Sequence, residues 1–402
     1  MNALSTSTHE KGRHAEPLVS VIVNNYNYAA YLGDAIESAL RQDYLQKEVL
    51  VVDDGSTDRT QDVIAGYGSR IIPIFKTNGG QASALNTGFS ASRGDIVLFL
   101  DADDVLLSSA LSNAVLAFNE PNVSNVRWPM WIVDAHGNKT GGTKPPEPPA
   151  EGDFCKQLFA RGPSNVPCSP TSGNAWSRSF LLRVLPMPED VFRLCADDYL
   201  YTLAPAFGLA RTINQPQGCY RIHGQNNYSA RSFQDKLQIE LSNYDKRCCA
   251  MSATLERNGM PVDVEPWKQH SWFHRLDRAV SDILNTVPDE SSFVLVEGGT
   301  WDAGGAFGRR SARPFFENNG EDWGPPPNSD TAVAYLESKR PAGINYLVIA
   351  WPSFWWFDEY PRLFEHLEET TTCALRTGEV VIYRLTPKLA SGPPSKNTMS
   401  LR

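Results

Sequence analysis

The sequence lacks the features that mark membrane-spanning, secreted and metal-finger proteins. No apolar run approaches the roughly 20 residues that a transmembrane helix needs. Its polar start has no apolar stretch typical of a secretory signal. The 7 cysteines are odd in number and show no CxxC spacing, which argues against a disulfide framework or a structural zinc site. We therefore expect reduced thiols and a cytoplasmic protein without a transmembrane segment.

The sequence also lacks an excess of positive charge. Lys and Arg total 37 against 46 for Asp and Glu, which gives a formal net charge of -9. Nucleic acids and anionic membranes recruit proteins through clustered Lys and Arg side chains. Nucleic acid is therefore not an expected partner, and any bound nucleotide must be held by a local site.

What is present is the composition of a globular protein, with 41% hydrophobic and 21% charged residues. A chain of 402 residues is too long for one ordinary core. The patterns along it predict five parts, which are a disordered tail at 1–16, an α/β domain at 17–229, a helical connector at 230–288, a second small α/β domain at 289–386 and a disordered tail at 387–402.

Short apolar runs alternate with helical periodicity between Leu18 and Phe118. The expected strands read VSVIV, EVLVV, IIPIF and DIVLFL, and amphipathic helices are expected between and after them. Runs that are apolar on both faces are typical of a parallel sheet covered by helices on each side. With right-handed crossovers, this order predicts an α/β fold with a doubly wound, mostly parallel sheet.

Polar side chains follow three of these strands. The clusters are Asn24, Asn25 and Tyr26, then Asp53 and Asp54, then Asp101, Asp103 and Asp104. Ligands of open α/β sheets bind outside the carboxyl ends of the strands, so we expect the clusters to meet in one crevice. Helix capping and turn formation are the alternative for any single cluster, but they do not explain the carboxylates at 101–104.

The carboxylates of the LDADD segment predict a metal site. Two like charges 4 Å apart repel by about 1 kcal/mol in water and by about 4 kcal/mol at an effective dielectric constant of 20. A buried crevice therefore keeps them ionised only beside a cation. Carboxylate oxygens suit Mg²⁺ or Mn²⁺, which retain water and share phosphate oxygens. The chemistry fits a diphosphate leaving group.

An ordered series of motifs covers roughly residues 17 to 225. It reads PLVSVIVNNYNYAAYL, VLVVDDGSTDRT, NGGQASALNTGFSASRGDIVLFLDADD, SGNAWSR, ADDYLY and YRIHG. In this order and spacing the series resembles the family 2 glycosyltransferases of the GT-A fold. The resemblance implies metal-dependent transfer of a sugar, with inversion, from a nucleotide-diphosphate donor to an acceptor hydroxyl.

The resemblance also assigns a donor site. Asn24 and Tyr26 would line the nucleoside pocket, and Asp54 would accept hydrogen bonds from the base or ribose. A core aromatic is the alternative for Tyr26. Gly80 would allow close backbone approach to the donor, and Asn86 would reach its sugar or phosphates.

Two further donor contacts and the metal ligands follow from the same resemblance. Asp101 would contact the donor and also bind the metal. Asp103 would be the direct metal ligand, with Asp104 as a supporting or alternative ligand. Asn174 would face the donor sugar or the acceptor, or be structural. His223 would complete the metal shell or lie near the diphosphate, with a purely structural role as the alternative.

The catalytic base is expected in ADDYLY. The resemblance assigns proton removal from the acceptor to Asp198, with Asp197 orienting it or sharing the proton. Such a base contributes typically about 10²- to 10⁴-fold to the rate. The alternative is an acidic helix start that complements the helix dipole.

Other functions compatible with the residues are a lapsed sugar-nucleotide or glycan-binding protein and a phosphatase. DADDV after an apolar strand is similar to the nucleophile strand of haloacid dehalogenase phosphatases, but there that strand normally opens the domain. The expected partners are a nucleotide-diphosphate sugar and a glycan, lipid-linked or small-molecule acceptor, as in polysaccharide biosynthesis. Peripheral membrane association is compatible with the sequence.

The small C-terminal domain contains an aromatic segment, WPSFWWFDEY. Clustered aromatic side chains predict packing in a core or interface, or else a sugar-stacking surface. Acceptor binding, partner docking and positioning of a polymer are the roles we consider for this domain.

Overall fold

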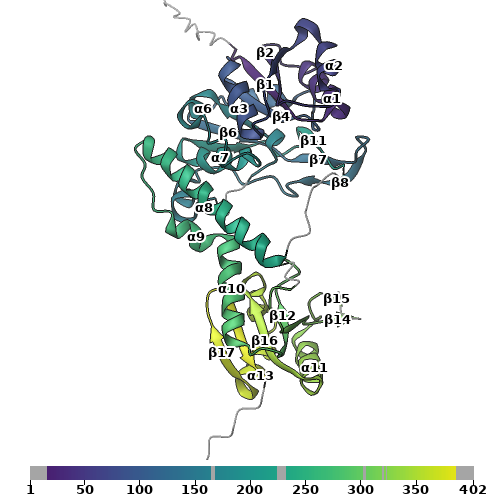
Figure 1. Cartoon of the computed structure of the whole chain (residues 1–402), viewed down its shortest axis with the longest axis vertical. Coiled ribbons are helices and arrows are strands. Elements are labelled where there is room, and N and C mark those ends of the chain that lie inside the picture. Colours follow the sequence, from purple (N-terminus) through teal and green to yellow (C-terminus); the bar gives the residue numbers. More distant parts are fainter. Residues whose placement is uncertain are drawn as a thin grey trace, which may run out of the picture. The chain divides into compact units, whose positions relative to one another are not determined.

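The structure is a computed structural model that describes residues 16–163, 168–223, 232–301, 305–318, 321–322 and 324–385. These residues form two compact units (Figure 1). The first unit contains 16–223 and 243–270, and the second contains 232–242 and 271–385, in each case as far as described. Both predicted tails lie outside the described residues, apart from Glu16.

The first unit alternates strands and helices. The long helix α8 (Phe233–Arg257) begins in the second unit and belongs to the first unit from Asn243 onward. The other elements of the first unit are β1 (Val19–Asn25), α1 (Ala29–Leu40), β2 (Lys47–Asp53), α2 (Thr60–Ala65), β3 (Ile72–Phe75), α3 (Gln81–Ala91), β4 (Ile96–Asp101), β5 (Val105–Leu106), α4 (Ala110–Ala117), β6 (Val123–Arg127), β7 (Met130–Val133), β8 (Lys139–Lys144), α5 (Cys155–Arg161), β9 (Asn174–Ser177), α6 (Arg178–Val184), α7 (Ala196–Leu203), β10 (Leu209–Thr212), β11 (Gly218–Arg221) and α9 (Glu265–His270).

The main sheet has seven described strands in the order β10-β6-β9-β4-β1-β2-β3. β4, β1, β2 and β3 run parallel, β6 and β10 run parallel, and β9 is antiparallel to both β4 and β6. A smaller sheet has the order β5-β11-β7-β8. In it β7 and β8 form a hairpin, as the segment VRWPMWIVDAHGNKT predicts with its turn at HGN. The prediction of an α/β fold with a mostly parallel sheet is confirmed.

Helices cover both faces of the main sheet because its central strands are apolar on both sides. Along β1, Val21 and Val23 belong to the cluster that contains Leu32 and Ile36 of α1, whereas Ile22 belongs to the cluster on the other face. All five side chains are fully buried. Each such side chain contributes about 1.5–3 kcal/mol when it is removed from water.

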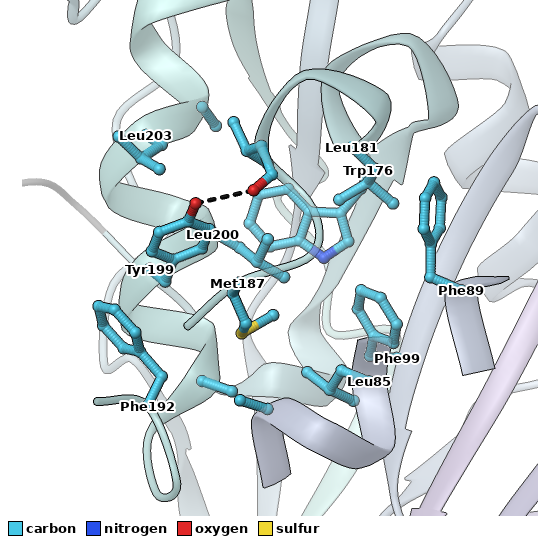
Figure 2. Close-up of a cluster of buried hydrophobic side chains, with 14 of the residues drawn as sticks. Leu85, Phe89, Phe99, Trp176, Leu181, Met187, Phe192, Tyr199, Leu200 and Leu203 are labelled. Atoms are coloured by element: carbon cyan, nitrogen blue, oxygen red, sulfur yellow. Dashed lines mark hydrogen bonds between the residues drawn. The ribbon is translucent and has the colours of Figure 1, made fainter. Parts of the chain in front are cut away.

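The cluster that contains Ile22 holds the helix α7 in place (Figure 2). Trp176 and Phe99 from the sheet pack in it with Tyr199 and Leu200 of α7. The Tyr199 hydroxyl donates to the carbonyl oxygen of Val184 at 2.7 Å, so its buried polar atom is satisfied. The start of α7, which carries ADDYLY, is thereby anchored to the sheet.

The second unit has its own sheet in the order β13-β12-β16-β18-β17. Its elements are α10 (Trp272–Thr286), β12 (Ser292–Val296), β13 (Ser311–Pro314), β14 (Glu317–Asn318), β15 (Glu321–Asp322), α11 (Ser329–Lys339), β16 (Ile344–Ala350), α12 (Trp356–Glu359), α13 (Pro361–Thr370), β17 (Thr372–Arg376) and β18 (Val380–Arg384). β12, β13 and β16 are parallel, and β18 is antiparallel to β16 and β17.

Several local predictions differ from the structure. The spacing of apolar residues from Asn174 to Val184 predicts a helix, but residues 174–177 form β9, because pairing with two strands of the main sheet overrides local propensity. β3 is a largely exposed edge strand and is not covered on both faces. β13 and β17 were not predicted. None of the described helices combines the length and the apolarity required to cross a bilayer.

Candidate active site

Three polar strand ends meet in one pocket of about 520 Å³. The neighbouring strands β4, β1 and β2 set the register, which pairs Asn24 with Asp101, and the Asn24 amide donates to Asp101 Oδ1 at 2.8 Å. The sequence-based expectation that these clusters converge is confirmed. Prominent among the lining residues are Asn24, Asn25, Tyr26, Asp54, Gly80, Asp101 and Asp103.

Tyr26 lies at the wall of this pocket with 45% of its surface exposed. The alternative of a core aromatic is therefore wrong. An exposed phenol ring beside a pocket offers a flat face on which a planar group can stack.

Asp54 is a buried carboxylate that organises the loop before α3. It accepts hydrogen bonds from Lys76 Nζ at 2.6 Å, from the Gly79 N–H at 2.9 Å and from the Gly80 N–H at 2.7 Å. Its side chain is only 3% exposed. Charge-assisted bonds of this kind are about twice as strong as neutral ones, so Asp54 holds the pocket wall in place. Its predicted contact with a base or ribose stays a prediction.

Gly80 allows two backbone segments to approach. It has a φ of 89°, and a Cβ added there would lie 2.7 Å from the carbonyl oxygen of Arg193. The Gln81 N–H donates to that same oxygen at 2.9 Å. The segment before α7 is thus tied to the start of α3, which only glycine permits at this separation.

The acidic residues after β4 differ in environment. Burial, with the charge of Asp103 as the next cause, raises the pKa of Asp101 to about 7. Asp104 is almost completely enclosed and accepts hydrogen bonds from Ser172 Oγ at 2.7 Å and from the Arg221 N–H at 3.1 Å. Burial raises its pKa well above the usual value. Asp101 and Asp103 line the pocket, whereas Asp104 supports the turn beneath them.

His223 lies next to Asp103. Its Nε2 is 3.0 Å from Asp103 Oδ2, and its ring stacks on Tyr31 at 5.2 Å with an edge contact to Tyr28 at 5.4 Å. Within the described residues, no group of three or more His, Cys, Asp or Glu side chains is arranged to hold a metal ion. The predicted ligands are therefore adjacent without forming a complete protein cage.

A second pocket of about 690 Å³ lies beside the first and shares Gln81 and Asp101 with it. Asp197 and Asp198, at the start of α7, line this pocket. The Gln81 side chain links the two acidic centres, because its Nε2 contacts Asp101 Oδ1 at 3.3 Å and its Oε1 accepts from the Ala196 N–H at 3.0 Å.

The two carboxylates on α7 have different partners. Asp198 accepts from Arg247 Nη1 at 3.2 Å and from Thr202 Oγ1 at 3.3 Å. Burial, followed by the charge of Asp198, raises the pKa of Asp197 to about 6. No local sequence pattern pointed to Arg247, because it lies on α8, 49 residues after Asp198, and only the fold brings the two side chains together.

The comparisons with known proteins decide the family. The model of glycosyl transferase family 2 matches residues 20–178. A relative from Nostoc sp., named as an uncharacterized glycosyltransferase, is 37% identical over 237 residues, which cover 56% of this chain and 73% of the relative. The chain belongs to glycosyl transferase family 2. It is a glycosyltransferase, and its fold is of the predicted GT-A type.

Other relatives match over shorter stretches. The chain covers 28% of the uncharacterized glycosyltransferase EpsJ of Bacillus subtilis, at 41% identity over 96 residues, which are 23% of this chain. It covers 33% of an uncharacterized glycosyltransferase of Rickettsia prowazekii, at 40% identity over 104 residues, which are 26% of this chain.

Solved structures match at low identity. S. aureus TarS 1-349 in complex with UDP-GlcNAc is 19% identical, with a TM-score of 0.43 over 67% of this chain and 82% of that one. The mannosyltransferase PcManGT from Pyrobaculum calidifontis, in complex with GDP-Man and Mn²⁺, is 22% identical, with a TM-score of 0.42 over 68% and 77%.

Two residues expected in the donor site of this family 2 enzyme lie outside both pockets. The Asn86 amide is buried and donates to the carbonyl oxygen of Met187 at 2.9 Å, and its Oδ1 accepts from the Met187 N–H at 2.9 Å. Asn174 is fully buried and donates to the Pro170 carbonyl oxygen at 2.8 Å. Both amides serve internal backbone groups, and the geometry adds no support to their predicted donor contacts.

Proposed function

We propose that this family 2 enzyme transfers a sugar from a nucleotide-diphosphate donor to an acceptor hydroxyl, with inversion and with a divalent cation. The observation that carries the proposal is the pair of adjoining pockets. One contains the acidic end of β4, the other contains the acidic start of α7, and Asp101 and Gln81 belong to both. A donor in the first and an acceptor in the second would place their reacting atoms at the shared wall.

The donor set fits Mg²⁺ or Mn²⁺. Mg²⁺ usually binds through one or two carboxylates plus substrate phosphates, so a pair of aspartates suffices without a protein cage. Asp101 and Asp103 are this pair, and burial, followed by the negative charge of Asp103, raises the pKa of Asp101. A cation held here supplies charge stabilisation to the departing diphosphate. His223 and Asp104 would support these two aspartates and orient their carboxylates.

Asp198 is the base in this proposal. Its carboxylate would accept the acceptor proton as the acceptor oxygen attacks the anomeric carbon, with no covalent sugar intermediate. Arg247 and Thr202 hold that carboxylate in one orientation, because each contacts a different oxygen of it. Asp197 would orient Asp198 or share the proton that Asp198 accepts.

The donor side would rely on Asn24, Tyr26 and the loop that Asp54 organises. Tyr26 would offer its exposed face to the base, and the Gly80 backbone, which packs against Arg193, forms part of the pocket wall. The acceptor, whether a glycan, a lipid-linked sugar or a small molecule, would enter the pocket that contains Asp198.

A donor screen tests this function. Nucleotide sugars with uracil, guanine and thymine bases are screened with Mn²⁺ for thermal stabilisation, and each hit is tested for release of nucleoside diphosphate on addition of acceptor. We expect stabilisation by at least one nucleotide sugar and turnover with it. Stabilisation by several donors without any turnover, across a broad acceptor panel, would instead favour a lapsed binding protein.

A further inference from the structure

The second unit contains a cavity of about 440 Å³ that the proposed reaction does not use. It lies at the carboxyl ends of the parallel strands β12, β13 and β16, where open α/β sheets place their ligands. Its volume falls within the range of about 300–1,000 Å³ that small-ligand pockets occupy. The chemically informative residues of its lining are Glu297, Arg313, Phe315, Ser353, Trp355 and Trp356.

The loop after β12 is built so that it does not bind an anion. Glu297 Oε2 accepts from the Thr300 N–H at 2.5 Å and from the Trp301 N–H at 2.9 Å. These backbone donors would otherwise form a concave site for phosphate, and a protein carboxylate already fills it. Among the lining residues, Glu297 and Arg313 supply one charge of each sign. A diphosphate therefore finds no surplus of positive charge here.

Ser353 supplies an unmet hydrogen-bonding group in the wall of the cavity. The residue is 1% exposed, and its Oγ has no hydrogen-bond partner among the described residues. Buried hydroxyls in folded proteins are nearly always paired. The backbone of Gly298 lies beside it, since a Cβ added there would be in van der Waals contact with Ser353 Oγ at 3.5 Å.

Aromatic rings form another part of the lining. Trp355 is 48% exposed, although indole rings are mostly covered in folded chains. Trp356 and Phe315 also line the cavity and are buried, with their ring centroids 5.0 Å apart. An exposed indole face packs well against the C–H face of a sugar ring, while hydroxyl, carboxylate and guanidinium groups can bond the sugar hydroxyls.

We infer that this cavity binds one sugar residue of an uncharged glycan, which the second unit would hold as a separate recognition site. The combination of an exposed Trp355, an unpartnered Ser353 hydroxyl and a charge-balanced lining favours a neutral polyhydroxylated ligand over a nucleotide. The site is independent of the metal and of Asp198, so it stands whether or not the proposed transfer reaction is correct.

Binding of neutral oligosaccharides to the full-length protein tests the site. Cellopentaose, laminaripentaose, mannopentaose and chitopentaose are titrated calorimetrically up to about 10 mM. We expect at least one of them to bind, and Trp355→Ala to weaken that binding by about 10-fold or more. Ser353→Ala should weaken it by a smaller factor. Asp103→Ala should leave this Trp355-dependent binding unchanged.

Trp272→Ala is the matched control, because Trp272 is also an exposed indole of the second unit, at 39%, and does not line the cavity. It should bind as the wild type does. The inference is overturned if none of the four oligosaccharides binds, or if Trp355→Ala and Trp272→Ala bind equally well. It is also overturned if the Trp355-dependent binding is restricted to nucleotide sugars such as UDP-glucose and GDP-mannose.

Discussion

Asp54→Asn tests whether one buried carboxylate holds the wall of the donor pocket. The substitution keeps the shape but removes the charge that faces Lys76, and it turns an N–H₂ group toward donors such as the Gly80 N–H. Removing one partner of a buried ion pair costs about 3–5 kcal/mol. We expect a loss of about 3 kcal/mol in the free energy of unfolding of the first unit, since Lys76 keeps some access to water.

The assay combines urea unfolding with hydrogen–deuterium exchange of the peptide that spans residues 76–86. Exchange at this loop should accelerate in Asp54→Asn, because Gly79 and Gly80 lose their acceptor. Asp58→Asn is the control: Asp58 is exposed and accepts from the Ala29 N–H at 2.9 Å. It should cost at most about 1 kcal/mol. Equal effects of the two substitutions on stability and exchange would refute the reasoning.

Three further substitutions probe the same region. Gly80→Ala should destabilise the protein by about 1–3 kcal/mol and raise the KM for the donor, because its φ is positive and its Cβ would meet Arg193; wild-type melting and KM would contradict this. Asp197→Asn should stabilise the fold at pH 7 by on the order of 1–2 kcal/mol while it lowers turnover. The pKa of about 6 means that the Asp197 carboxyl binds its proton more tightly in the folded than in the unfolded protein. The stability that this proton binding contributes is lost as the pH rises from about 4 to about 6. The stability gained by Asp197→Asn should therefore vanish at about pH 4. Arg247→Ala should lower kcat more than it changes the donor KM, with partial recovery in Arg247→Lys; an unchanged kcat would show that the ion pair with Asp198 does not orient the base.

The sequence was most informative where local pattern and chemistry coincide. β1, β2 and β4 are apolar on both faces and end in polar residues, so both their parallel packing and the meeting of Asn24, Asp54 and Asp101 could be predicted. Strand polarity alone places these side chains at one edge of the sheet. The acidic start of α7 was located in a different way, by the resemblance of the motif ADDYLY to the family.

Contacts between distant segments could not be read from the sequence. Asn174 was expected near the donor, but its strand β9 is inserted between β4 and β6, which buries the side chain against backbone groups. The Asn86 amide pairs with Met187, 101 residues further along the chain. Arg247 reaches Asp198 only because α8 packs on the first unit through residues such as Met251. Each of these outcomes depends on tertiary packing that no local pattern encodes.

Release of nucleoside diphosphate by wild type and Asp103→Ala, measured with Mn²⁺ and with EDTA, tests metal-dependent transfer most directly. The donor is the one that the screen identifies, and Asp58→Asn serves as the control variant. Wild type and Asp58→Asn should turn over with Mn²⁺ and stop with EDTA, and Asp103→Ala should lose about 10²- to 10³-fold in kcat under every divalent metal. Near-normal turnover by Asp103→Ala, or undiminished turnover by the wild type in EDTA, would contradict the assignment of a cation to this aspartate.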